Sequence, residues 1–408
     1  MRLRQNMLWM LCGNGTFAAF QWLYLICTAH IYGPEAAGYY ALALAIIYPA
    51  FALLNLQLRR LQVTDRESQI PYAAYAFYAA VSGVVAFLAA LAIFFAMESP
   101  GIELCLIFVA LGSAKFVEYM SETCYGHLQY SELMMPIARS LFMRNSCGFA
   151  LFFGMALFGL PLSYAVFAIP SAWAVVYFLH DLKQVKSVDR WPRLSKDLSG
   201  HLKTIIRTGL PLGGLIFLNQ LYITAPRMLL VELSSVTALG YFAPIASLIT
   251  LGSLFIGSAN GAALPRLSRF HANGDIRSFV LLAVKLCLLT VAVGSGAIAL
   301  AWFAGDLIVA AIFDKPHPDA QKTLLVTMVA GAFWYLGGAT GTVLTASRSF
   351  GAQLQTSVVL LIVVSGFGIA LIPVYGMLGA AYALVAGAAT KFLLQLGVIG
   401  VRHARTAS

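Results

Sequence analysis

Twelve stretches of this chain are apolar over about 20 residues each, and this pattern limits the possible folds more than any other feature. Roughly 20 such residues in a helix cross the hydrocarbon core of a bilayer, where every backbone N–H and C=O group must be paired within the protein. Only 10% of the residues are charged, against about 25% in soluble domains. We therefore predict an all-α polytopic membrane protein with about twelve transmembrane helices. The stretches are 9–31, 38–57, 72–97, 102–121, 133–159, 162–180, 208–231, 236–263, 279–303, 323–346, 353–373 and 377–400.

The positive charges are distributed unevenly between the connections of these spans. With the N-terminus placed in the cytoplasm, 18 of the 26 Lys and Arg residues fall in cytoplasmic segments, and two, Lys315 and Lys322, fall outside. This bias follows the positive-inside rule and predicts that both termini are cytoplasmic. The net charge of +10 is thus interpreted as a signal of topology, and no nucleic-acid partner is expected.

A short phrase occurs twice, 202 residues apart. Gly38-Tyr39-Tyr40-Ala41 opens one apolar run, and Gly240-Tyr241-Phe242-Ala243 opens another. A spacing near half of the 408 residues indicates a duplicated six-helix unit, an arrangement common in transporters. Because six spans return the chain to its starting side, we expect two six-helix bundles related by pseudo-twofold symmetry about the membrane normal. The predicted N-terminal bundle covers residues 1–180, and the C-terminal bundle covers 208–408.

Between these bundles, residues 181–207 are predicted to form a basic cytoplasmic linker. Such residues are attracted to anionic lipid headgroups, by about 1 kcal/mol each near the surface. The pair Trp191-Pro192 favours an interfacial segment. The basic residues of the linker include Lys183, Lys186, Arg190, Arg193, Lys196 and Lys203.

Charged residues inside the predicted spans are candidate functional residues, because each costs roughly 2.5–3.5 kcal/mol to insert. In the fourth span Lys115, Glu118 and Glu122 are three and four residues apart and share one helix face. In the fifth span Arg139 and Arg144 lie roughly 10 and 18 Å inside the cytoplasmic boundary, at a rise of about 1.5 Å per residue. We expect Lys115 and Arg139 to face each other at similar depth, with Glu118 able to neutralise either.

A basic patch of this kind in a water-filled cavity can hold a pyrophosphate, because a guanidinium donates two parallel hydrogen bonds to phosphate oxygens. The candidate residues for binding pyrophosphate or sugar are Arg144, Arg139, Lys115 and, late in the seventh span, Arg227. The candidates for charge pairing or proton coupling are Glu118 and Glu122. The alternative interpretation is structural, with ion pairs that hold the helices together and Arg139 extending to the headgroups.

The sequence shows no pattern of catalytic or metal-binding residues. It has no Walker A pattern, no metal-ligand spacing and no Ser/His/Asp set that a sequence can place. The six cysteines have no paired spacing that would indicate a disulfide framework. We therefore expect no enzymatic activity, no cofactor and no metal.

Short motifs along nearly the whole chain resemble those of bacterial polysaccharide-transport proteins. The motifs consist mostly of Gly, Pro and small apolar residues, so the order of the motifs along the chain is stronger evidence for the resemblance than any single motif. They include Gly33-Pro34-Glu35-Ala36-Ala37-Gly38-Tyr39-Tyr40, Tyr125-Gly126, Ala138-Arg139-Ser140, Gly209-Leu210-Pro211-Leu212, Leu264-Pro265-Arg266-Leu267 and Ile372-Pro373-Val374-Tyr375-Gly376. The family resembled is that of the O-antigen and capsule repeat-unit flippases, within the multidrug/oligosaccharidyl-lipid/polysaccharide exporter (MOP) superfamily.

This resemblance implies a flippase in the bacterial plasma membrane. Its cargo would be an undecaprenyl-pyrophosphate-linked oligosaccharide repeat unit, moved from the cytoplasmic to the outer leaflet by alternating access for lipopolysaccharide O-antigen, capsule or exopolysaccharide synthesis. The implied partners are this glycan lipid, membrane lipids, and a glycan polymerase with other assembly proteins. One position departs from the pattern: Pro226-Arg227 stands where an acidic residue is expected.

Two other functions stay open. A multidrug or cation antiporter of the same superfamily should carry acidic residues deep in the first or seventh span, and both spans lack them before Glu232. A membrane glycan polymerase, ligase or acyltransferase should carry a large external loop, whereas the longest predicted external connection covers only residues 304–322.

Overall fold

The computed structural model describes residues 2–65, 70–97, 101–188, 197–347 and 349–407. Within these ranges the regular structure is α-helix with two short π-helical segments, and there is no β-strand. Eleven of the described helices are long and apolar enough to cross a membrane, and α1 (Arg2–Cys27) is a further helix of 26 residues. The prediction of an all-α multi-pass membrane protein with about twelve spans in two bundles is confirmed.

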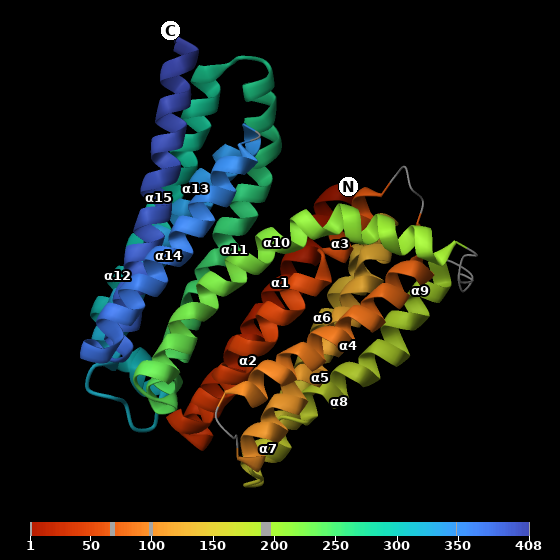
Figure 1. Cartoon of the computed structure of the whole chain (residues 1–408), viewed down its shortest axis with the longest axis vertical. Helices are drawn as coiled ribbons and strands as arrows, with labels where there is room; N and C mark the ends of the chain where they lie inside the picture. The colour runs from red at the N-terminus through yellow and green to blue at the C-terminus, as the bar shows by residue number, and fades with distance from the viewer. Residues whose placement is uncertain (1, 66–69, 98–100, 189–196, 348, 408) are drawn as a thin grey trace. The chain divides into compact units, whose positions relative to one another are not determined.

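The first of two compact units contains the chain up to Cys27 and the segment Tyr39–Gln220. In this unit α4, α5, α6 and α8 run alongside one another (Figure 1). A buried cluster around Tyr72, Tyr125 and Leu141 joins α4, α5 and α6. Beside α1, most of α2 (Pro34–Asn55) and the first part of α10 (Leu198–Leu233), the helices are α3 (Leu58–Thr64), α4 (Tyr72–Ala96), α5 (Ile102–Tyr130), α6 (Met134–Leu157), α7 (Leu162–Ala165), α8 (Ala168–Val176), the π-helical η2 (Tyr177–Asp181) and α9 (Leu182–Val188).

The second unit contains Thr28–Gly38 and the chain from Leu221 onward. Here α13, α14 and α15 pack together, and α12 lies against α13 (Figure 1). The side chain of Asp275 caps α12 by accepting a hydrogen bond from the Ser278 backbone N–H at 3.0 Å, which holds the pKa of this carboxyl below its ordinary value. The helices are the π-helical η1 (Thr28–Tyr32), the end of α10, α11 (Val236–Ala272), α12 (Ile276–Ile312), α13 (Ala320–Ala346), α14 (Phe350–Tyr375) and α15 (Met377–Ala407).

Large apolar side chains cover much of the outer surface of these helices. On α12, Leu300, Trp302 and Phe303 are exposed by 59–86%. Soluble monomers rarely expose apolar patches of this kind over a wide area. In a bilayer such side chains meet lipid tails, which are as apolar as they are.

The predicted linker, residues 181–207, is helical on both sides of the segment 189–196. Leu182–Val188 form α9, and α10 (Leu198–Leu233) begins well before the seventh span expected at 208–231. The boundaries 1–180, 181–207 and 208–408 stay a prediction. The residues Arg190, Trp191, Pro192, Arg193 and Lys196 lie outside the described residues.

The glycines that open the two copies of the repeated phrase both lie in the second unit, where the start of α2 (Pro34–Asn55) contacts the start of α11. Gly38 lies against the carbonyl oxygen of Val236, and Gly240 lies against the carbonyl oxygen of Pro34. Gly38 and Gly240 are equivalent positions 202 residues apart, and so are Pro34 and Val236. Each contact thus joins a glycine of one half to the equivalent carbonyl of the other half, as in a contact across a local twofold axis. A Cβ atom on either glycine would overlap the opposing carbonyl, so both positions require glycine.

Candidate functional site

Two carboxylates of the fourth span, α5, form ion pairs with basic side chains inside the first unit. The Nζ atom of Lys115 donates to Oε2 of Glu118 at 3.0 Å, as their i, i+3 spacing predicts. The same ammonium lies 4.5 Å from the ring centroid of Tyr48 on α2. One turn further along α5, Glu122 accepts a hydrogen bond from Nη1 of Arg59 at 2.8 Å.

Arg59 was not among the predicted site residues, and backbone geometry accounts for its position. Leu56 and Gln57 adopt positive φ angles of 49° and 55°, so the chain turns sharply from α2 into α3. This turn directs Arg59 toward α5, where its Nε atom also donates to Oε1 of Gln129 at 2.9 Å. Two consecutive residues other than glycine in the left-handed backbone conformation have no clear sequence signal. The pairing of Arg59 with Glu122 was therefore not predicted.

Arg144 on α6 is the most unusual member of the group. Its side chain is 1% exposed, and its Cζ atom lies 4.8 Å from the ring centroid of Trp173, 5.4 Å from that of Phe17 and 5.6 Å from that of Tyr125. Within the described residues, neither Nε nor Nη1 has a hydrogen-bond partner. Because buried guanidinium donors are normally paired, these two nitrogen atoms need a partner that the folded chain does not supply.

Three carboxylates lie within electrostatic range of Arg144 without a direct ion pair to it. They are Glu118, Glu122 and Asp181. Glu118 and Glu122 are bound to other cations, and Oδ1 of Asp181 lies 3.0 Å from Nδ1 of His180. The guanidinium of Arg144 is therefore held by aromatic faces and by long-range attraction, an arrangement that leaves its hydrogen-bond donors available to an anion.

A small cavity lies beside this group of charges. It is lined by Gln21, Tyr48, Lys115, Glu118 and Trp173, together with further residues of α2, α5 and α8. Its volume is about 20 Å³, which is room for one water molecule. This cavity is too small for a sugar or a pyrophosphate group.

The structure does not bring all the predicted residues together. Arg139 lies exposed on α6, because five residues of helix rotate its side chain by about 140° from that of Arg144. The predicted encounter between Arg139 and Lys115 is not formed, and Lys115 pairs with Glu118 instead. Arg227 is half-buried on the part of α10 that belongs to the second unit.

The aromatic partners of the cations carry no recognisable sequence signal. Trp173, Tyr125 and Phe17 belong to three different helices, and the sequence contains many similar aromatic residues. In the second unit, Nζ of Lys391 lies 4.3 Å from the ring centroid of Trp334, another contact that the sequence does not reveal. Among the described residues, no group of three or more His, Cys, Asp or Glu side chains is placed to hold a metal ion.

The chain is similar in sequence to one known protein and in structure to two others described below. It is 26% identical over 388 residues to the capsular polysaccharide biosynthesis protein CapF of Staphylococcus aureus, covering 92% of this chain and 94% of CapF. Its structure matches the lipid II flippase MurJ in an inward closed conformation, with a TM-score of 0.72, 11% identity and coverage of 96% of this chain and 87% of MurJ. It also matches the inward-facing conformation of a multidrug resistance MATE family transporter of the MOP superfamily, with a TM-score of 0.70, 14% identity and coverage of 97% and 95%. No protein-family model matches the chain. At these identities the solved structures establish a shared fold.

Proposed function

We propose that this chain, which has the fold of the MOP superfamily and resembles its polysaccharide-transport members in sequence, is a flippase for lipid-linked glycans. Its cargo is an undecaprenyl-pyrophosphate-linked oligosaccharide repeat unit of O-antigen, capsule or exopolysaccharide. The protein moves this cargo from the cytoplasmic to the outer leaflet of a bacterial plasma membrane, with both of its own termini in the cytoplasm.

The observation that carries the proposal is the buried guanidinium of Arg144, in which Nε and Nη1 have no hydrogen-bond partner among the described residues. A diphosphate supplies acceptor oxygens that fit the guanidinium fork, and the negative charge balances a cation that the folded chain does not pair directly. The similarity to CapF over 92% of the chain supports a polysaccharide cargo. In this proposal Lys115 is a second cation that can exchange Glu118 for a phosphate oxygen.

The cost of desolvation decides how the two ends of the cargo would move. Sugars and pyrophosphate cannot leave water for hydrocarbon without replacing their hydrogen bonds, so they travel through an internal polar cavity. The polyprenyl tail has no such requirement and stays in lipid between helices. Since the cavity beside Lys115 and Trp173 has room for only about one water molecule, we infer that the headgroup crosses in another conformation, as in alternating access.

The test is to deplete the protein from a bacterial strain that needs it for polysaccharide export and to measure undecaprenyl-linked glycans. Complete repeat units should accumulate on the cytoplasmic side and disappear when the wild-type protein is expressed again. Arg144→Ala should fail to restore export at unchanged protein abundance. Arg144→Lys should restore it in part, because an ammonium keeps the charge without the fork. Lys183→Ala, which changes an exposed residue of α9, should restore export fully.

Normal export without the protein, together with altered sensitivity to cationic drugs, would support the antiporter of the same superfamily. Two of the three carboxylates near Arg144 argue against that alternative, because an organic cation requires an uncompensated carboxylate. Glu118 and Glu122 are both bound to cations of this chain at 2.8–3.0 Å. A membrane polymerase or ligase would instead leave single repeat units on the outer leaflet.

A further inference from the structure

A second and larger cavity lies at the C-terminal end of α5, within a few residues of the pairing of Arg59 with Glu122 and Gln129. Three helix ends meet there, and each contributes two side chains spaced i, i+3, which places both on one helix face. The cavity has a volume of about 290 Å³, at the lower edge of the roughly 300–1,000 Å³ typical of ligand sites. The three pairs are Gln62 and Asp65 from α3 and its C-cap, Tyr72 and Tyr75 from α4, and His127 and Tyr130 from α5.

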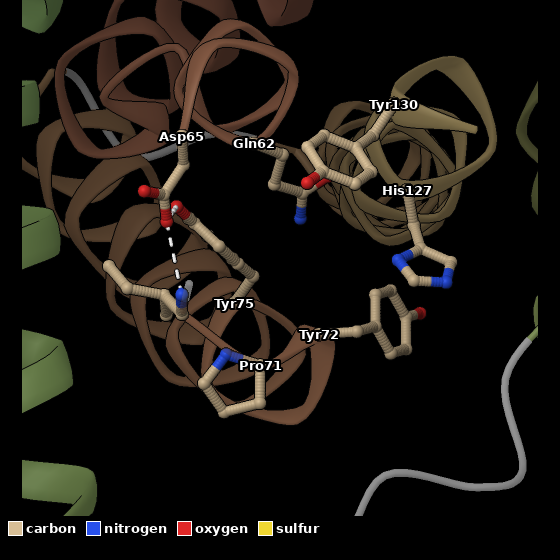
Figure 2. Close-up of a pocket in the computed structure, with 8 residues that line it drawn as sticks. Gln62, Asp65, Pro71, Tyr72, Tyr75, His127 and Tyr130 are labelled. Atoms are coloured by element: carbon tan, nitrogen blue, oxygen red, sulfur yellow. Dashed lines mark hydrogen bonds between the residues drawn. The ribbon is translucent and has the colours of Figure 1, made fainter. Parts of the chain in front are cut away.

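The carboxamide of Gln62 is directed into this cavity (Figure 2). The residue is 6% exposed, and neither Nε2 nor Oε1 has a hydrogen-bond partner within the described residues. A buried amide with both polar atoms unpaired is costly, so it indicates a missing partner. Gly126 makes this position possible, because a Cβ atom there would overlap Oε1 of Gln62.

The other polar side chains around the cavity are held in place by the protein. Oδ2 of Asp65 accepts hydrogen bonds from the Ile70 backbone N–H at 3.1 Å and from the Tyr75 hydroxyl at 3.3 Å. The Tyr72 hydroxyl lies 3.1 Å from Sγ of Cys124. The ring of Tyr72 also contacts that of His127 at 5.2 Å between centroids, so these side chains present ordered aromatic faces. The site is thus built before any ligand arrives.

We propose that this cavity, which we call the α3–α4–α5 pocket, binds one neutral sugar ring. A hydroxyl or acetamido group both donates and accepts, so it can satisfy Oε1 and Nε2 of Gln62 together. The aromatic side chains of Tyr72, His127 and Tyr130 offer apolar faces against which the C–H face of a sugar can pack. The volume admits one ring and excludes a whole oligosaccharide.

Charge chemistry rules out the main competing ligands. A phosphate or other anion would meet the carboxylate of Asp65 and would offer no donor to Oε1 of Gln62. An organic cation would offer no acceptor to Nε2 of Gln62, which would stay buried and unpaired. A neutral polyol meets both requirements.

The pocket assignment rests on the proposed function for its biological meaning. The ends of α3 and α5 and the start of α4 are all predicted to be cytoplasmic, which is the side where a lipid-linked glycan would arrive. A sugar held there would position the glycan before its pyrophosphate reaches the interior of the first unit. The pocket would then select among glycans by one sugar residue.

The test is binding of free sugars to the purified full-length protein, measured by saturation-transfer NMR. The probes are glucose and N-acetylglucosamine, with choline and inorganic pyrophosphate as the cationic and anionic comparisons.

Gln62→Leu should weaken sugar binding by roughly three- to tenfold, the factor expected for loss of one or two neutral hydrogen bonds. Tyr130→Ala should weaken it as well, and because Tyr130 is 37% exposed, this change should not impair folding. Gln184→Leu, the same change on a half-buried residue of α9, should bind like the wild type.

The pocket assignment is overturned if neither sugar binds, or if the Gln62, Tyr130 and Gln184 variants all bind a sugar equally well. It is also overturned if binding of choline or pyrophosphate, and not binding of a sugar, depends on Gln62. This result is separable from the flippase test. Export that depends on Arg144 with no sugar bound at Gln62 rejects the pocket and retains the flippase. Sugar binding that depends on Gln62, in a protein whose depletion leaves export normal, retains the pocket and rejects the flippase.

Discussion

Arg144 combines the charge of a binding residue with the burial of a core residue. Among the described residues its guanidinium has no direct ion pair, and two of its three nitrogen atoms have no hydrogen-bond partner. Replacing such a buried charge by an apolar side chain of similar volume is often neutral or stabilising. Residues kept for function commonly reduce stability in this way.

The burial of Arg144 predicts a variant that keeps its stability and loses transport. Arg144→Met should unfold at the same temperature as the wild type or a higher one, because methionine fills the space between Trp173, Phe17 and Tyr125 without an unpaired donor. The same variant should not support export. The measurement is thermal unfolding of the purified protein beside the export assay. A large loss of stability would instead assign Arg144 to the packing of the helices.

The ion pair between Arg59 and Glu122 should behave in the opposite way. Arg59→Met should destabilise the protein by about 1–3 kcal/mol, because Glu122 keeps its charge and loses its partner. Combining Arg59→Met with Glu122→Gln should recover part of that loss, since the amide is neutral. A double-mutant cycle on thermal or denaturant unfolding measures the coupling, expected at about 0.5–3 kcal/mol. Purely additive effects would show that the pair contributes nothing beyond its separate side chains.

At the scale of helices, the crossing of α2 and α11 depends on the glycines of the repeated phrase. Gly240→Ala should destabilise the protein by about 1–3 kcal/mol, the usual cost of overpacking, because the opposing atom is the backbone carbonyl of Pro34 and cannot rotate away. Gly38→Ala should act similarly against Val236. The measurement is the unfolding temperature of each purified variant.

Gly257 on α11 provides the matched control. A Cβ atom there would have no neighbour within 4 Å, so Gly257→Ala adds only helix propensity, worth roughly 0.5–1 kcal/mol. This variant should be as stable as the wild type or slightly more stable. Equal losses at Gly240 and Gly257 would contradict the close crossing.

At the scale of the whole molecule, the distribution of positive charge predicts which loops face which side. In a variant without the six native cysteines, Asp314→Cys should react with a membrane-impermeant maleimide in intact bacterial cells, because its loop between α12 and α13 is predicted to be external. Lys183→Cys should react only after the membrane is opened. Both residues are exposed, so burial cannot explain a difference. Labelling in the reverse pattern would invert the predicted topology.

Much of the architecture was predictable because its signals are local. The length and apolarity of a span depend on consecutive residues, and an i, i+3 pair such as Lys115 and Glu118 lies on one face whatever surrounds the helix. The order of motifs along the chain predicted the fold of a helical transporter, and the solved structures of MurJ and of a MATE family transporter share that fold with TM-scores of 0.72 and 0.70. The repeat at Gly38 and Gly240 indicated a duplication, and the structure adds that the two copies touch.

The sequence by itself thus determined an all-helical membrane protein, its approximate number of spans and which charges share a helix face. Only the tertiary structure decided that Arg144 is enclosed by aromatic rings from three helices while Arg139 is exposed, and that Arg59 reaches Glu122 across 63 residues of chain. It also decided that Gln62 opens into a cavity formed by three helix ends. The physical reason is that contacts between helices depend on how each helix is rotated and how deeply it packs. Those quantities are set by the summed packing of many side chains and by turns such as Leu56-Gln57, and no short stretch of sequence encodes them.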